Sequence, residues 1–161
     1  LKINPKGRVP ALITSKGILT ETPAIMYYIC MLHPEQKLAP NDPYELAEAQ
    51  AFNMYLSSTV HVGHAHKHRG QRWTNDEHAL NSLTAQVKNN MTSYAEYIEK
   101  NLFKGPWVLG KNYSMCDPYL ALVTRWFRDD GVDMNKFPLI VQHNENFNKR
   151  DSVKKVTELH R

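Results

Sequence analysis

Residues 4–22, NPKGRVPALITSKGILTET, decide how the amino-terminal part of this chain folds. An early proline and glycine predict a turn, and Pro10 precedes a short apolar run, a position where a strand tolerates proline. The Gly-containing loop at residues 15–17 predicts a hairpin, after which Glu21 and Thr22 stand at the start of a helix. An open backbone edge beside a carboxylate and a hydroxyl can bind a small peptide-like ligand that carries an amine and a carboxylate.

The same stretch resembles the glutathione-binding half of the glutathione transferase family, in which Asn-Pro-x-Gly-x-Val-Pro-x-Leu precedes a hairpin and an acid–hydroxyl pair. The resemblance implies a cis Val9–Pro10 bond and a Val9 backbone that pairs with the cysteinyl part of glutathione. It also implies that Glu21 and Thr22 hold the γ-glutamyl end, with Thr22 in place of the usual serine. The expected glutathione-binding residues are therefore Arg8, Val9, Pro10, Glu21 and Thr22.

Composition limits the class of protein. The chain has 161 residues, 42% of them hydrophobic, which suits one to two domains with a sizeable core. No apolar run is long enough to span a membrane, and we expect no signal peptide. Cys30 and Cys116 lie in apolar helical stretches, which predicts reduced core residues and a cytoplasmic protein. Because the net charge of +4 is spread along the chain, we expect no nucleic-acid partner.

Helix signals fill the rest of the chain. They predict a helix over 22–33 with Thr22 as its N-cap, then a proline-rich linker over 34–43. Asp42 is expected to cap a long helix that runs to about Arg69. The three-to-four spacing of apolar residues predicts further helices over 75–101, 114–129, 136–149 and 151–160.

This order of elements resembles the layout of glutathione transferases, and it predicts an α/β plus all-α protein. The resemblance implies part of a thioredoxin-like domain at 1–33, a linker at 34–43 and an all-helical domain at 44–161. It also implies that the missing strands and helix of the first domain precede Leu1. The Tyr, Ser or Cys that acts on the glutathione sulfur belongs to that part, so we expect this chain to be incomplete for catalysis.

Residues 110–117, GKNYSMCD, carry a second motif. Ser114 and Asp117 have the spacing of a capping box. In this motif the serine side chain accepts from a backbone N–H near the acid, and the acid side chain accepts from the backbone N–H of the serine. The motif resembles the capping box that opens the central buried helix of glutathione transferases. We expect Ser114→Ala or Asp117→Ala to cost about 1–2 kcal/mol of stability.

Four histidines lie close together at His61, His64, His66 and His68. On a helix, His61, His64 and His68 share one face, and three interpretations stay open. In the first, this face lines the ligand site, and His61 assists at the glutathione sulfur; residues 58–61 resemble a run in bacterial, beta-like transferases. In the second, the histidines are solvated or packed on a polar face. In the third they bind a metal, although no Cys, Asp or Glu is close in sequence, and we expect no metal.

Arg69, Arg72 and Trp73 follow the histidines. They are residue types that stack on nucleic-acid bases. Cations that stabilise a helix carboxyl end, with Trp73 as a packing residue, explain them more simply.

Two hypotheses about function follow from the resemblance. The first is a glutathione transferase that conjugates the thiolate of glutathione, its co-substrate, to hydrophobic electrophiles, in a homodimer with Met26 and Tyr27 at the interface. The alternative is a non-catalytic binding or regulatory module with the same fold. The acid–hydroxyl pair Glu21–Thr22 favours ligand binding, because a pure interaction module has less need of it.

Overall fold

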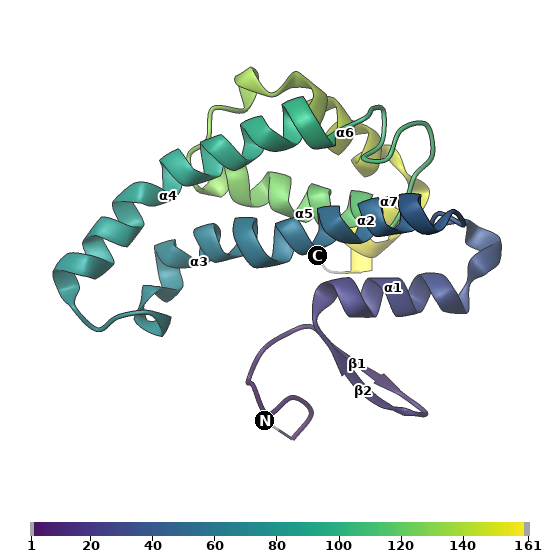
Figure 1. Ribbon diagram of the computed structural model, residues 1–161, viewed down its shortest axis with the longest axis horizontal. Helices are drawn as coiled ribbons and strands as arrows, with labels where there is room; N and C mark the ends of the chain where they lie inside the picture. The colour runs from purple at the N-terminus through teal and green to yellow at the C-terminus, as the bar shows by residue number, and fades with distance from the viewer. Residues whose placement is uncertain (1, 160–161) are drawn as a thin grey trace.

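The computed structural model describes residues 2–159 of the chain. Leu1, His160 and Arg161, which the predicted ranges include, lie outside the described residues. Figure 1 shows a β-hairpin and a first helix on one side of most of the remaining helices. The expected order of hairpin, helix, linker and helical bundle is therefore confirmed, whereas the division into domains at residues 34–43 stays a prediction.

The hairpin consists of β1 (Ala11–Thr14) and β2 (Gly17–Thr20), paired antiparallel so that Ala11 faces Thr20. Gly17 has a φ of 137°, a conformation that glycine adopts without a steric penalty, and this permits the tight turn between the strands. The preceding Val9–Pro10 peptide bond is cis, as the resemblance implies. The hairpin leads directly into the first helix, which fixes the distance between the proline edge and that helix's start.

Helix α1 spans Thr22–Leu32, and the prediction that Thr22 is its N-cap is wrong. Glu21 precedes the helix with a φ of 72° and a ψ of 120°, and no side chain caps the first turn. The chain turns sharply at Glu21, so Thr22 becomes the first helical residue and Pro23 the second. The amino end of α1 is therefore left without a side-chain acceptor from its own sequence.

The predicted long helix is present as α2 (Pro43–Tyr55), a π-helical turn and α3 (His61–Arg69). Asp42 caps it as expected, because its Oδ1 accepts from the N–H groups of Tyr44 and Glu45, each at 2.9 Å. Gly63 has a packing role: a Cβ there would lie 2.7 Å from a ring carbon of Tyr94. Glycine thus allows α3 to approach the next helix closely.

The remaining helices follow the predicted ranges within a few residues. Apolar residues recur at helical spacing along each of them, although the last helix has no buried residue. They are α4 (Glu77–Tyr97), α5 (Cys116–Asp129), α6 (Pro138–Lys149) and α7 (Asp151–Leu159). Among residues 2–159, none of the helices is long and apolar enough to cross a membrane.

The core of the molecule lies around α5, between α2 and α6. Leu56, Leu120, Phe127 and Ile140 are among its fully buried side chains. Both cysteines are buried and unpaired, as predicted, and burial raises the pKa of the Cys116 thiol to about 12. This thiol therefore stays protonated and behaves as an apolar packing group.

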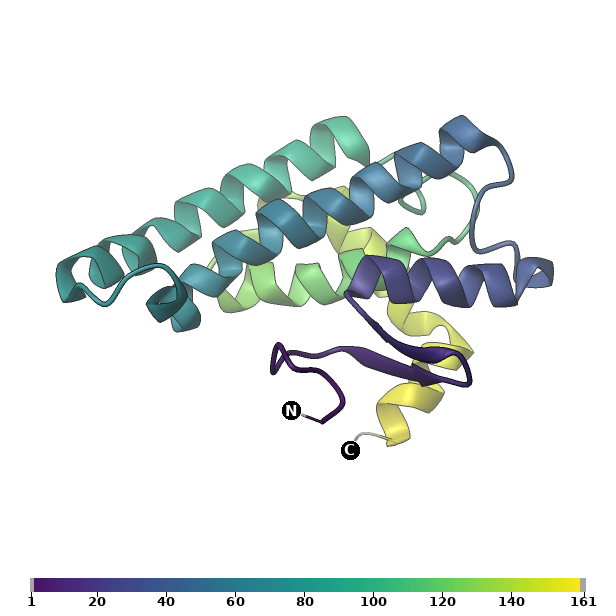
Figure 2. The same cartoon turned by 60° about the horizontal axis from the view of Figure 1, so that its bottom comes forward.

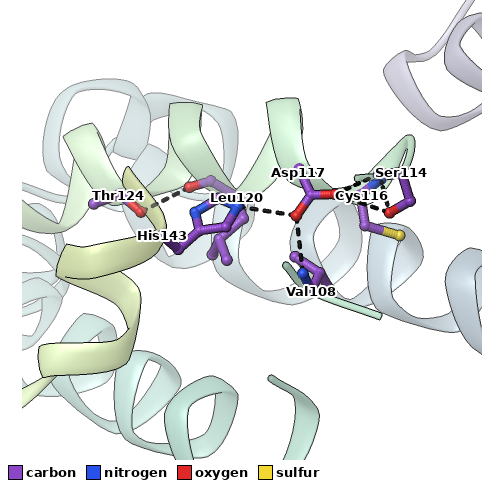
Figure 3. Close-up of polar contacts among 7 residues, drawn as sticks. All are labelled: Val108, Ser114, Cys116, Asp117, Leu120, Thr124 and His143. Carbon is purple, nitrogen blue, oxygen red and sulfur yellow. Dashed lines mark hydrogen bonds and ion pairs between the residues drawn. The ribbon is translucent and has the colours of Figure 1, made fainter. Parts of the chain in front are cut away.

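The carboxylate of Asp117 organises the start of α5 (Figure 3). Its Oδ2 accepts from the Ser114 N–H at 2.6 Å, the hydrogen bond that the motif predicts, and from the Ser114 hydroxyl at 3.0 Å. Its Oδ1 accepts from the Val108 N–H at 2.8 Å and contacts Nε2 of His143 at 3.0 Å. Asp117 thus connects the loop before α5, the helix itself and α6, which is more than a local cap provides.

Candidate functional site

A cavity of about 400 Å³ lies where the amino-terminal turn and the start of α1 meet α3. In both Figure 1 and Figure 2 the amino-terminal turn lies on the hairpin side of the helices. The cavity brings together all the predicted glutathione-binding residues and the predicted assisting histidine: Arg8, Val9, Pro10, Glu21, Thr22 and His61. The two residues of the capping box, Ser114 and Asp117, do not line it.

Asn4 holds the amino-terminal turn in shape. Its side-chain N–H donates to the Arg8 carbonyl at 2.7 Å, and its Oδ1 accepts from the Lys6 N–H at 3.1 Å. Within residues 2–159, the main-chain N–H and C=O of Val9 have no hydrogen-bond partner, and Val9 is 93% exposed. Pro10 fixes the chain beside it. The result is a backbone edge that is open to an extended peptide ligand.

Glu21 places an ionised carboxylate at the cavity. Lys6 donates a hydrogen bond to its Oε1, and this bond lowers the pKa of Glu21 below its usual value. The side chain is still 69% exposed, and its second oxygen accepts from no residue of the described chain. The carboxylate can therefore accept hydrogen bonds from a ligand ammonium group. Lys6 lies at the variable position of the motif, so nothing in the pattern singled it out.

Tyr119 also lines the cavity, and the sequence did not reveal this role. It lies on the first turns of α5, among apolar residues that point into the core, so the spacing gave no sign of it. Burial, helped by the negative charge of Glu21, raises the pKa of Tyr119 to about 12. The phenol hydroxyl therefore keeps its proton and can donate to a ligand at neutral pH.

His61 lies on the α3 side of the cavity. Its ring packs against Trp126, with centroids 4.9 Å apart, and its Nε2 lies 3.5 Å from a guanidinium nitrogen of Arg69. Burial lowers the pKa of His61 below 6.5, and the positive charge of Arg69 lowers it further. The imidazole is therefore neutral at pH 7, with one nitrogen that can donate and one that can accept.

The other histidines have separate contacts. His64 stacks on Trp126 at 4.8 Å, and its Nδ1 lies 2.7 Å from Oδ2 of Asp130, whose side chain is fully buried. No acid is close to the histidines in the sequence, but the end of α5 brings Asp130 to α3. His66 packs edge-on against Trp73. Among the described residues, no group of three or more His, Cys, Asp or Glu side chains is placed to hold a metal ion.

Three arginines line the cavity together with Trp73: Arg8, Arg69 and Arg72. We call these three arginines the arginine wall. None of them forms an ion pair with a carboxylate of residues 2–159. Partial desolvation lowers the pKa of Arg72, and repulsion from the nearby charges of Arg8 and Arg69 lowers it further, although Arg72 is exposed. Arg69, Arg72 and Trp73, which the sequence favours as residues of a helix end, thus also line the cavity.

Comparisons with known proteins agree with this geometry. The sequence model of the family described as "Glutathione S-transferase, N-terminal domain" matches residues 1–30. A crystal structure of a glutathione transferase homologue from Sulfitobacter, with bound glutathione, is 41% identical. Its TM-score is 0.96, and the match covers 99% of this chain and 77% of that one.

Curated relatives give the same family. "Glutathione S-transferase GstA" of Escherichia coli O157:H7 is 31% identical over 126 residues, which is 77% of this chain and 59% of that protein. "Glutathione S-transferase Z2" of Arabidopsis thaliana is 28% identical over 153 residues, 92% of this chain and 67% of that protein. The chain thus spans only part of the length of these relatives.

Proposed function

Because this chain belongs to the glutathione transferase family, we propose that its cavity binds glutathione and that the whole protein conjugates glutathione to hydrophobic electrophiles. One observation carries the proposal. The open Val9 backbone, the ionised Glu21 and the uncapped start of α1 line the same cavity. These are the three features that a γ-glutamyl tripeptide needs from a binding site.

Each part of glutathione has a chemical partner in this cavity. The Glu21 carboxylate accepts from the γ-glutamyl ammonium, and Lys6 keeps Glu21 ionised. The Thr22 hydroxyl and the free N–H groups at the amino end of α1 donate to the γ-glutamyl carboxylate. The Val9 N–H and C=O pair with the cysteinyl backbone. Arg8 is placed to attract the negative charge of the tripeptide.

His61 assists at the sulfur in this proposal. A neutral imidazole donates a hydrogen bond to the glutathione thiolate without offering it a proton as acidic as an imidazolium. Arg69, beside its Nε2, adds a positive charge that favours the thiolate over the thiol. Positioning of the sulfur and electrostatic stabilisation of its charge would together lower the barrier to attack on an electrophile.

Retention on glutathione-agarose, with elution by free glutathione, tests the binding step. We expect Glu21→Gln and Thr22→Val to lower glutathione affinity at least about tenfold in calorimetric titration, since each removes one charge-assisted hydrogen bond. Glu35→Gln, an exposed acid outside the cavity, is the matched control and should bind like the parent chain. Failure of the parent, in its full-length form, to bind glutathione would refute the proposal.

Turnover separates the enzyme from a binding module. With 1-chloro-2,4-dinitrobenzene and glutathione, the full-length protein should form the conjugate faster than the uncatalysed reaction. Glutathione binding without any acceleration would instead support the non-catalytic, regulatory module.

We also propose a cytoplasmic homodimer. Two free, buried cysteines suit a reducing compartment. Tyr27 on α1 is 36% exposed, and partly buried Met26 lies next to it, which suits an interface on this helix. Light scattering coupled to size-exclusion chromatography tests the dimer, and Tyr27→Glu should shift it towards monomer.

A further inference from the structure

The arginine wall has more positive charge than glutathione can neutralise. Lys6 already pairs with Glu21, so the positive charges of Arg8, Arg69 and Arg72 are uncompensated within residues 2–159. A glutathione thiolate carries two net negative charges, from two carboxylates, one thiolate and one ammonium. One positive charge therefore stays uncompensated when glutathione is bound through its thiolate.

The residues that line the cavity indicate where this uncompensated charge lies. Arg69 and Arg72 belong to the end of α3 and the short turn after it, together with Trp73, whereas Glu21, Thr22 and Val9 belong to the hairpin side. His61 lies on α3 next to Arg69. The two arginines and the 47% exposed Trp73 thus line the α3 side of the cavity, which is also the side of His61.

We propose that the second substrate of this cavity is an anionic electrophile, an aromatic or unsaturated compound that carries a carboxylate bound by Arg69 and Arg72. This inference rests on the proposed function and makes the chemical class of its electrophilic substrate more specific. Trp73 offers an aromatic face to the apolar part of the substrate, and a guanidinium binds a carboxylate through two parallel hydrogen bonds. A bound anion would offset the repulsion from Arg8 and Arg69 that helps to lower the pKa of Arg72.

With a chlorodinitrobenzoate, the chemistry balances as follows. The glutathione thiol gives its proton to solvent, and the thiolate sulfur donates an electron pair to the carbon that carries chlorine. A C–S bond forms, the C–Cl bond breaks, and chloride leaves with its electron pair. The carboxylate takes no part in the bond changes, so it can stay bound to Arg69 and Arg72 throughout.

Two glutathione conjugates test the proposal by binding alone. S-(4-carboxy-2,6-dinitrophenyl)glutathione carries the extra carboxylate, and its 4-carboxamide is the uncharged compound of the same shape. We expect the full-length protein to bind the carboxylate at least about tenfold more tightly at low salt, and the preference to shrink as salt screens the charges. In Arg69→Gln and Arg72→Gln the preference should fall below about threefold. Arg125→Gln, an exposed arginine of α5 outside the cavity, is the matched control and should retain it.

The outcomes separate this inference from the proposed function. Binding of glutathione with equal affinity for the two conjugates would overturn the anionic substrate and leave the transferase in place. Loss of affinity for glutathione itself in Arg69→Gln and Arg72→Gln, with an unchanged carboxylate preference, would assign the arginines to the tripeptide instead. Absence of glutathione binding by the parent would overturn both proposals. In turnover, 4-chloro-3,5-dinitrobenzoate should be preferred over the corresponding benzamide by a similar factor.

Discussion

Glu21 and Asp117 are both acids at the start of a helix, and their surroundings are opposite. Asp117 has a fully buried side chain and accepts from two backbone N–H groups, one hydroxyl and one imidazole. Glu21 is exposed and, among residues 2–159, caps no N–H group of α1 and pairs only with Lys6. The hydrogen-bonding capacity of Asp117 is used within the fold, whereas one carboxylate oxygen of Glu21 is unused within residues 2–159.

Backbone conformation sharpens this contrast. Glu21 has a φ of 72°, where a residue with a Cβ is strained by about 1–3 kcal/mol. A helix start that served stability alone would use glycine at this φ, or an acceptor that caps the turn. The combination of a strained backbone and an unused carboxylate fits the proposed binding role of Glu21, while the start of α5 stabilises the fold.

The largest expected effect is that of Asp117→Ala on stability. The change leaves His143 and two backbone N–H groups buried without their acceptor, so we expect a loss of about 3–5 kcal/mol. This exceeds the about 1–2 kcal/mol predicted from the motif, because the motif did not include Val108 and His143. Urea unfolding measures it, with the exposed cap Asp42→Ala as a control that should cost about 1 kcal/mol. Equal losses in Asp117→Ala and Asp42→Ala would mean that Asp117 stabilises the fold no more than an exposed cap does.

Glu21 should show the reverse pattern. We expect Glu21→Gly to lower glutathione affinity at least about tenfold, and to raise the free energy of unfolding by up to about 1 kcal/mol through relief of backbone strain. Glu21→Gln should lose the same affinity with a stability change below about 0.5 kcal/mol, since an exposed ion pair contributes little. Calorimetric titration and urea unfolding of the two variants separate charge from backbone. A large destabilisation by Glu21→Gln would place Glu21 with Asp117.

Ser114→Ala should have a smaller effect than Asp117→Ala. The Ser114 hydroxyl donates to Asp117 and accepts from the Cys116 N–H at 3.3 Å, while the strong backbone contacts of Asp117 do not need it. We expect a loss of about 1–2 kcal/mol in thermal or urea unfolding and unchanged glutathione affinity. An unchanged unfolding curve would show that the hydroxyl adds nothing to the cap.

His61 should give the smallest effect, a change in how stability depends on pH. Its folded-state pKa is lowered, chiefly by burial, so the unfolded chain takes up a proton first as the pH falls. The contribution of the neutral ring is complete above pH 6.5 and is lost as the pH falls towards the folded pKa. On acidification, His61→Gln should therefore lose less unfolding free energy than the parent chain does, and we expect the difference to be below about 1 kcal/mol. Urea unfolding at a series of pH values measures it. A steeper acid loss in the variant would mean that the ring is stabilised as a cation.

Much of the fold could be read from local signals. Turn residues gave the hairpin, Asp42 with Pro43 gave the start of α2, and apolar spacing gave the helices. The N-cap of α1 lies one residue before the predicted Thr22, because the backbone of Glu21 is not helical and Thr22 is already the first helical residue. The side-chain hydroxyl of Thr22 gives no information about the backbone conformation of Glu21.

The candidate site likewise contains some residues that the sequence could identify and others that it could not. The proposed glutathione-binding residues lie within one short stretch, residues 8–22, so the resemblance to a family could single them out. Lys6, Tyr119 and Asp130 carry no such mark, and each acquires its role from a contact made across the fold. Arg69 and Arg72 were assigned to a helix end, because a sequence does not show that two arginines near residue 70 face a third at residue 8.

By itself, the sequence determined the secondary structure, the family and the chemical types of the binding residues, because these depend on neighbours close along the chain. Tertiary structure alone decided the charge balance of the cavity, the burial of Asp117 and the neutral state of His61. The physical reason is that desolvation and Coulomb interactions depend on distance in space, and packing brings together groups that are far apart in the chain.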